Sequence, residues 1–150
     1  MKYIEKELNH IKKLLELSFI DPVESKDLQN FVLGPSKRIR SALALYFLKS
    51  NQIELNENTY KILLAGELIH NASLLHDDVI DNAKMRRNCK TLGYKYDKNF
   101  AILAGDFILS IAIKNLLEIN NSKVFEDIET LKSVQAVAMR IIDEDPKLEK

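Results

Sequence analysis

Apolar residues recur every three to four positions through most of the chain, which is the spacing that places them on one face of an α-helix. From residue 4 to 17, Ile4, Leu8, Ile11 and Leu15 alternate with lysine and glutamate, the pattern of an amphipathic helix. Similar spacing predicts helices over about 39–49, 59–80, 100–118 and 124–143. No segment shows the two-residue alternation of a strand between hairpin turns. The expected fold class is therefore all-α.

Proline, glycine and capping residues mark where these helices are expected to begin and end. The pair Asp21-Pro22 favours a helix start, and Gly34-Pro35 interrupts the chain. Ser36 is expected to cap the helix that follows. The polar segments 51–58 and 82–99 are predicted connectors, the second with room for a short helix. No linker or internal repeat divides the sequence, so residues 1–150 are interpreted as one domain.

Composition narrows the class of protein. Lys+Arg and Asp+Glu are balanced at 22 each, which argues against a strongly basic nucleic-acid binder. The single cysteine, Cys89, excludes an internal disulfide framework and fits a reducing compartment. Charges interrupt the apolar residues of the first helix, so it does not resemble a signal peptide. No apolar run reaches the roughly 18 residues of a transmembrane helix. We expect a cytoplasmic protein without a transmembrane segment.

The segment 66–88 carries the candidate chemistry. On a helix, His70, Leu74, Asp77 and Asp81 fall on one narrow stripe, and Asp78 lies one step around from Asp77. The opposite side carries residues available for packing: Leu68, Ala72 and Leu75. Three carboxylates this close repel one another unless a cation joins them. Oxygen ligands with room for water favour Mg²⁺. The alternative interpretation is a solvated acidic turn.

Basic residues flank this segment on both sides. Arg86 and Arg87 follow the aspartates, and guanidinium groups match phosphate oxygens in a two-pronged hydrogen bond. Lys37 and Arg40 are three residues apart at an expected helix N-terminus, where the backbone already favours an anion. Carboxylates for a metal and cations for phosphate together suggest a diphosphate site. Each basic cluster taken alone could equally be a solvated turn.

Four segments in this order resemble the trans-isoprenyl diphosphate synthases, also called polyprenyl synthetases. They are GPSKRIRSAL at 34–43, LIHNASLLHDDVID at 68–81, MRRNCKT at 85–91 and ILAGDFILS at 102–110. The resemblance covers roughly residues 30–115 and implies an isoprenoid-synthase-like helical bundle, of which this chain would be the N-terminal half. It departs from the family pattern at several positions, one being Ser41, where a proline is usual.

The family reaction joins an allylic diphosphate to isopentenyl diphosphate, and the resemblance implies roles by position. Asp77, Asp78 and Asp81 would be the catalytic carboxylates that hold Mg²⁺ on the allylic diphosphate. Arg86 would bind the allylic diphosphate. The residues implied for isopentenyl diphosphate are Lys37, Arg40, His70 and Arg87. The small residues Ala72 and Ser73, just before the aspartate motif, would favour a longer-chain product.

Two further polar residues are given lesser roles. His76 lies off the aspartate stripe and is expected to be a packed, hydrogen-bonded histidine. Asp106 of the LAGD segment would contact the residues that bind the metal, or would make an ordinary polar contact within its helix. The acidic tail around 143–145 is interpreted as a solvated terminus.

Family members are about twice as long, and their second aspartate-rich motif has no counterpart in these 150 residues. Half of the bundle would expose apolar faces that the full fold covers. We therefore expect a prenyltransferase subunit that works as a homo- or hetero-oligomer, with a partner that supplies the second motif. The alternatives are a truncated, non-catalytic chain and a regulatory or interaction subunit that binds diphosphate without turnover. A metal hydrolase is disfavoured, because it would give the arginine pair no role.

Overall fold

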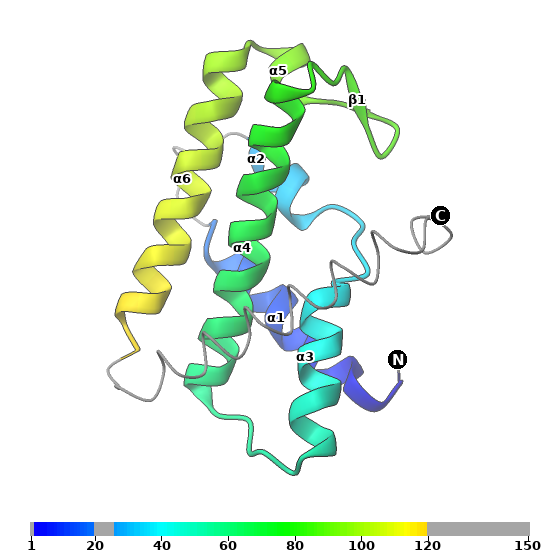
Figure 1. Cartoon of the computed structure of the whole chain (residues 1–150), viewed down its shortest axis with the longest axis vertical. Helices are drawn as coiled ribbons and strands as arrows, with labels where there is room; N and C mark the ends of the chain where they lie inside the picture. Colours follow the sequence, from blue (N-terminus) through cyan, green and yellow to red (C-terminus); the bar gives the residue numbers. More distant parts are fainter. Residues whose placement is uncertain (1, 20–25, 120–150) are drawn as a thin grey trace.

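The computed structural model describes residues 2–19 and 26–119, and within them the chain is almost entirely helical (Figure 1). A short 3₁₀ turn, Lys2–Ile4, leads into α1, Glu5–Leu17. Helix α2, Lys26–Leu33, α3, Ile39–Ser50, and α4, Glu57–Ile80, follow. After a small hairpin come α5, Leu92–Lys95, and α6, Lys98–Leu117. The expected all-α fold class is confirmed. The predicted helix start at Asp21-Pro22 and the predicted helix 124–143 lie outside the described residues.

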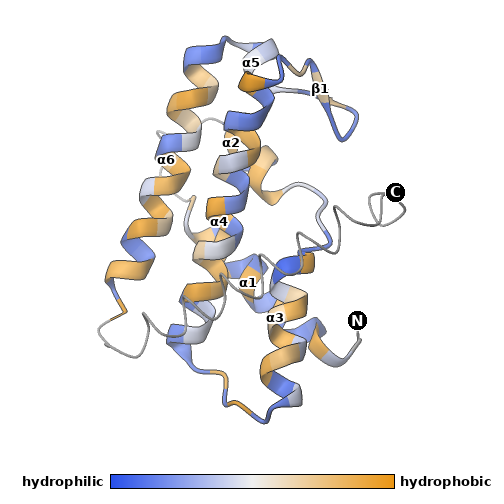
Figure 2. Cartoon of the chain, viewed as in Figure 1, coloured by the Kyte–Doolittle hydropathy of each residue, from blue (hydrophilic) through white to orange (hydrophobic). Residues whose placement is uncertain are grey.

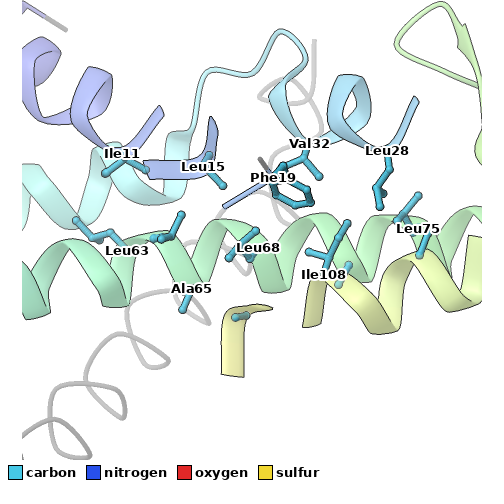
Figure 3. Packing of buried hydrophobic residues seen from close by; sticks show 14 of the residues in the cluster. Ile11, Leu15, Phe19, Leu28, Val32, Leu63, Ala65, Leu68, Leu75 and Ile108 are labelled. Atoms are coloured by element: carbon cyan, nitrogen blue, oxygen red, sulfur yellow. The ribbon is translucent and has the colours of Figure 1, made fainter. Parts of the chain in front are cut away.

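The long helix α4 is the centre of this arrangement. Helix α6 packs along one side of it, while α1, α2 and α3 approach from the other (Figure 1). The face of α4 predicted to pack is buried, with Leu68 and Leu75 fully enclosed and Ala72 3% exposed. Figure 3 shows these helices contributing to one core, in which Leu15 of α1, Val32 of α2 and Ile108 of α6 surround α4.

Asparagine and aspartate caps explain why the two longest helices begin earlier than their apolar pattern predicts. Asn56 accepts a hydrogen bond from the backbone N–H of Thr59 at 2.9 Å, and the Thr59 hydroxyl completes the capping box. Asp97 accepts from the N–H of Phe100 at 2.7 Å and starts α6. The caps satisfy backbone donors that the first turn leaves without an intrahelical partner.

The start of α3 differs from the sequence expectation. Ser36 was expected to cap this helix, but the residue at the cap position is Arg38, in the left-handed conformation with φ 45°, and its side chain makes no capping bond. The Ser36 hydroxyl instead accepts the N–H of Arg38 at 3.2 Å within the loop. The helix begins at Ile39, as the apolar pattern predicts, but without the expected serine cap.

A two-residue antiparallel ladder, β1 (Met85–Arg86) with β2 (Cys89–Lys90), interrupts the predicted connector 82–99. The two residues between the strands, Arg87 and Asn88, both have positive φ, at 48° and 61°. That is the requirement of a tight type I′ hairpin. The strands are too short to produce a readable two-residue alternation. The predicted short helix in this connector is α5.

Helix α6 is long and apolar enough, by length and composition only, to cross a membrane. The sequence analysis finds no apolar run long enough for a transmembrane helix, whereas α6 meets the length and composition criterion even though Asp106 interrupts its apolar residues. In the structure, 28% of its apolar window is buried. One such helix is weak evidence for a membrane span, because core helices have the same composition. Figure 2 shows that hydrophobic residues recur along the whole length of α6, with hydrophilic residues between them.

Candidate functional site

Three segments distant in sequence meet beside the C-terminal half of α4. The loop 34–38 and the first turn of α3 lie on one side, and the hairpin 85–90 folds back from the end of α4 (Figure 1). The Arg87 guanidinium donates a hydrogen bond to the Pro35 carbonyl at 3.3 Å, across 52 positions of sequence. This contact brings the basic loop and the arginine pair to the same face of α4.

His70 lies at the centre of the resulting positive cluster. Its pKa is lowered from 6.5 to about 4, first because the imidazole is withdrawn from water, and then because Arg40, Arg87 and Arg86 oppose a further positive charge. His70 is therefore neutral at pH 7. Four of the residues that the resemblance implied for diphosphate binding thus lie close enough to act on one another. Lys37 is exposed on the adjoining loop.

The aspartates do not gather as their spacing suggested. Asp77 and Asp81 are exposed, but Asp78 is only 4% exposed, and its Oδ1 accepts from the Arg86 Nε at 2.8 Å. Across residues 2–19 and 26–119, no three His, Cys, Asp or Glu side chains are close enough to share a metal ion. The physical reason is the helical rotation between neighbours, which turns Asp78 inward when Asp77 faces outward.

Two of the three carboxylates in the motif could bind a hydrated divalent cation. Asp77 and Asp81 are one helical turn apart and present only oxygen, the ligand that Mg²⁺ prefers when it keeps several waters. Asp78 does not fit that role here, because one of its oxygens is paired with Arg86. Its other oxygen, Oδ2, is buried.

The backbone leaving α4 is held by a residue that the sequence analysis missed. Thr91 is 3% exposed, and its hydroxyl donates to the Ala83 carbonyl at 2.6 Å while accepting the N–H of Tyr94 at 3.2 Å. The Ala83 N–H donates in turn to the Asp78 carbonyl at 2.9 Å. These bonds close the loop that carries Arg86 and Arg87. A threonine before a helix start is a recognisable capping signal, but its second bond is visible only in the fold.

The contact between Glu67 and Ser41 was also missed. Glu67 is 4% exposed, and its Oε1 accepts the Ser41 hydroxyl at 2.5 Å and the Ser41 N–H at 3.4 Å. Burial lowers the pKa of the neighbouring Arg40 from its ordinary value, and the charge of Glu67 partly opposes that shift. The buried carboxylate therefore fixes the first turn of α3, which carries Arg40, against α4.

The two small residues expected to influence product length face different ways. Ala72 is 3% exposed and belongs to the core, whereas Ser73 is exposed, and its hydroxyl donates to the His70 carbonyl at 2.8 Å. Only Ser73 lies on the outer face of the helix, one turn before Asp77. The influence of either residue on product length stays a prediction.

His76 and Asp106 meet between α4 and α6. The His76 Nε2 is 3.4 Å from both the Asp106 Oδ1 and the Ile102 carbonyl. A Cβ on Gly105 would lie 2.4 Å from that nitrogen, so glycine permits this approach. His76 is thus a packed, hydrogen-bonded histidine, as expected. Asp106 contacts that histidine on the neighbouring helix, which is neither of the two roles expected for it.

Residues 23–143 match the polyprenyl synthetase family. Component 2 of heptaprenyl diphosphate synthase from Geobacillus stearothermophilus is 37% identical over 90 residues, 60% of this chain and 28% of that protein. The crystal structure of heptaprenyl diphosphate synthase from Staphylococcus aureus has a TM-score of 0.69 at 31% identity, covering 85% of this chain and 41% of that one.

A Helicobacter pylori geranyltransferase, solved with magnesium and isoprenyl diphosphate, has a TM-score of 0.65 at 28% identity, covering 85% of this chain and 46% of that one. This chain spans less than half the length of each of these three proteins. The isoprenoid-synthase helical bundle is nevertheless the fold of its neighbours, and the match covers most of the sequence. By these matches, the chain belongs to the polyprenyl synthetase family.

Proposed function

We propose that this chain forms the substrate-binding part of a trans-prenyltransferase, which condenses isopentenyl diphosphate with an allylic diphosphate. The observation that carries the proposal is the positive cluster around His70. Burial and, after it, the charges of Arg40, Arg87 and Arg86 lower the pKa of this histidine, which supports a shared positive field around it. A diphosphate is the ligand chemistry that such a group of guanidinium ions matches.

The roles proposed for individual residues follow their positions around this cluster. Arg86 binds the allylic diphosphate, beside the exposed carboxylates of Asp77 and Asp81. The residues proposed for isopentenyl diphosphate are Lys37, Arg40, His70 and Arg87. Neutral His70 offers a hydrogen bond without adding charge, and the arginines supply the positive field. Arg40 is half-buried, so its attraction for an anion is screened less than that of an exposed side chain.

Asp77 and Asp81 are the proposed ligands of Mg²⁺. The magnesium found with isoprenyl diphosphate in the H. pylori geranyltransferase supports this choice of ion. When bound, the ion supplies Lewis-acid stabilisation of the departing diphosphate. The chain's own contribution is to orient that diphosphate with Arg86 and to hold the second substrate near His70.

The proposal includes a second carboxylate cluster from outside these 150 residues, on a partner polypeptide. Helix α6 supports it, because it exposes large apolar side chains: Ile102, Leu103, Phe107, Ile113 and Leu117. An exposed apolar face of this kind marks an interaction surface. The relative from G. stearothermophilus is itself named as one component of a synthase. We place the assembly in the cytoplasm, with a longer-chain product favoured by Ser73.

A diphosphate-binding subunit without turnover is the second candidate. It is favoured by the pairing of Asp78 with Arg86, which leaves two rather than three carboxylates open to a metal. Such a subunit would bind both diphosphates and would regulate or stabilise a catalytic partner. The third candidate is a truncated, inactive chain. It would have the same pairing of Asp78 with Arg86, but it would have no catalytic partner to bind.

Prenyl transfer is the experiment that separates these possibilities. Labelled isopentenyl diphosphate, an allylic primer and Mg²⁺ are incubated with the chain alone and with a family chain that carries the second aspartate motif. We expect product only in the mixture, and loss of that product in Asp77→Ala. Product from the chain alone would contradict the need for a partner. Diphosphate binding without product in either case would favour the regulatory subunit.

A further inference from the structure

The first turn of α3 is held by a carboxylate from another helix. Ser41 is buried, and its hydroxyl donates to Glu67 Oε1 of α4 at 2.5 Å, while its N–H donates to the same oxygen at 3.4 Å. That N–H is one of the first-turn donors that an α-helix leaves without an intrahelical partner. Arg38, at the cap position, makes no side-chain capping bond. Glu67 therefore does for α3 what a capping residue does for other helices.

Both bonds depend on a departure of this chain from the family pattern. Proline is usual at position 41, and proline has neither an N–H nor a hydroxyl with which to reach a carboxylate. The serine in this chain supplies both donors. The contact between Ser41 and Glu67 is thus a feature of this sequence and not of the shared motif.

Arg40, the neighbour of Ser41, lies within the electrostatic reach of the same carboxylate. Burial lowers the pKa of Arg40, and the charge of Glu67 opposes that shift. Burial also lowers the pKa of His70, and the charge of Arg40 is the next largest cause. Arg40 therefore acts on the proposed diphosphate site while a buried acid acts on it. In the described part of the chain, its guanidinium makes no hydrogen bond or ion pair.

The Ser41 hydroxyl and the Arg40 guanidinium are alternative donors for the Glu67 carboxylate. A buried carboxylate oxygen without a good donor carries the cost of its lost hydration, so it pairs with the best donor within reach. The hydroxyl fills that role, and the arginine keeps its five N–H donors for an anion. Without the hydroxyl, Oε1 would keep only the 3.4 Å bond from the backbone. The guanidinium one residue away would then pair with the carboxylate and be withdrawn from a diphosphate.

We infer that Ser41 is a positioning residue, which occupies the Glu67 carboxylate and so keeps Arg40 available to a diphosphate. Ser41 is 2% exposed and acts on the ligand only through these two side chains. The inference rests on the proposed function, because Arg40 is a proposed ligand of isopentenyl diphosphate. It explains how a buried acid can lie beside a diphosphate site without capturing one of its arginines.

The test measures the affinity of the full chain for inorganic diphosphate in EDTA, which removes any contribution of Mg²⁺. Ser41→Ala is expected to weaken binding about threefold, because desolvation and ordering of the guanidinium offset most of what the new pair gains. Ser110→Ala, the matched control on α6, should leave the affinity unchanged. If Ser41→Ala does not fold, Ser41→Cys replaces it in every comparison, since a thiol of similar size is only a weak donor.

Coupling to Glu67 distinguishes this role from a structural one. Glu67→Gln removes the charge that would capture the arginine and keeps an oxygen for the Ser41 hydroxyl. It should raise the affinity about threefold more in the Ser41→Ala background than in the parent. An equal change in both backgrounds would mean that the carboxylate acts only as a distant charge, and it would overturn the inference.

Arg40 supplies a second comparison. In an Arg40→Ala background, adding Ser41→Ala should weaken diphosphate binding no further, because no arginine is left to withdraw. A loss equal to that in the parent would overturn the inference and would indicate that Ser41 merely stabilises α3.

The unmodified chain separates the inference from the proposed function. If it does not bind diphosphate, the proposed function fails, and this role fails with it. If it binds diphosphate and Ser41→Ala binds equally well, the inference alone is overturned.

Discussion

Replacing Ser41 with alanine should destabilise the chain, because it removes the main hydrogen bond of the buried Glu67 carboxylate. The Ser41 hydroxyl donates to Glu67 Oε1 at 2.5 Å, and the 3.4 Å bond from the Ser41 N–H is weak by comparison. A hydrogen bond to a charged group contributes about 1.5–3 kcal/mol. Alanine returns about 0.5 kcal/mol through its higher helix propensity. The expected net loss in the free energy of unfolding is about 2 kcal/mol.

Ser110→Ala is the matched control for this change. Ser110 also lies in a helix, but it is exposed, and its hydroxyl donates only to the Phe107 carbonyl of its own helix at 2.7 Å. The same gain in helix propensity applies, so this variant should be as stable as the parent or slightly more stable. The difference in stability between the two variants therefore measures the tertiary hydrogen bond of Ser41 separately from a hydrogen bond within one helix.

Urea unfolding followed by circular dichroism is the assay. For a slope of about 2 kcal/mol per molar, a loss of 2 kcal/mol lowers the midpoint by about 1 M urea. Ser41→Ala should show that shift and Ser110→Ala should not. Equal midpoints for the two variants would refute the reasoning, since they would mean that the Glu67 carboxylate is not buried at the start of α3.

Further measurements address the rest of the site. The pKa of His70 falls from 6.5 to about 4 on folding, so below pH 6.5 only the unfolded chain takes up its proton. Stability should fall from pH 6.5 to 4 by at most about 3 kcal/mol, an effect absent in His70→Asn. Bound diphosphate should raise the same pKa, which an NMR titration would detect. Gly105→Ala should gain little of the ~1 kcal/mol that helix propensity offers, because the new Cβ meets His76 at 2.4 Å, and adding His76→Ala should recover it in urea. Thr91→Val should cost about 1–2 kcal/mol, since its bond to the Ala83 carbonyl is lost, and a smaller loss would argue against a closed hairpin.

Much of the fold was predictable because helices depend on local periodicity. The apolar spacing from Ile4 to Leu15 predicts α1, and the side of α4 that carries Leu68 and Leu75 was correctly expected to be buried. The helix starts were less predictable. Asn56 shows why, since a polar residue outside the apolar pattern begins α4 by capping it.

The candidate site was predictable in its members but not in its internal contacts. The type and spacing of the basic and acidic residues on and around the 66–88 segment predict a diphosphate site, and that role stays a prediction. Helical rotation could place Asp78 one step around from Asp77, but it could not reveal that the pocket there contains Arg86. Nor could it show that Glu67 accepts a bond from Ser41, 26 positions away.

The sequence by itself determined the helical class and the apolar face of the central helix. Those features depend on neighbours within one or two helical turns, where spacing fixes direction. The tertiary structure decided which carboxylate is buried, which residues meet around His70 and how the hairpin returns to α4. Those outcomes depend on contacts such as Arg87 with the Pro35 carbonyl, 52 positions apart. Desolvation and pairing across such distances follow from packing, which local spacing does not specify.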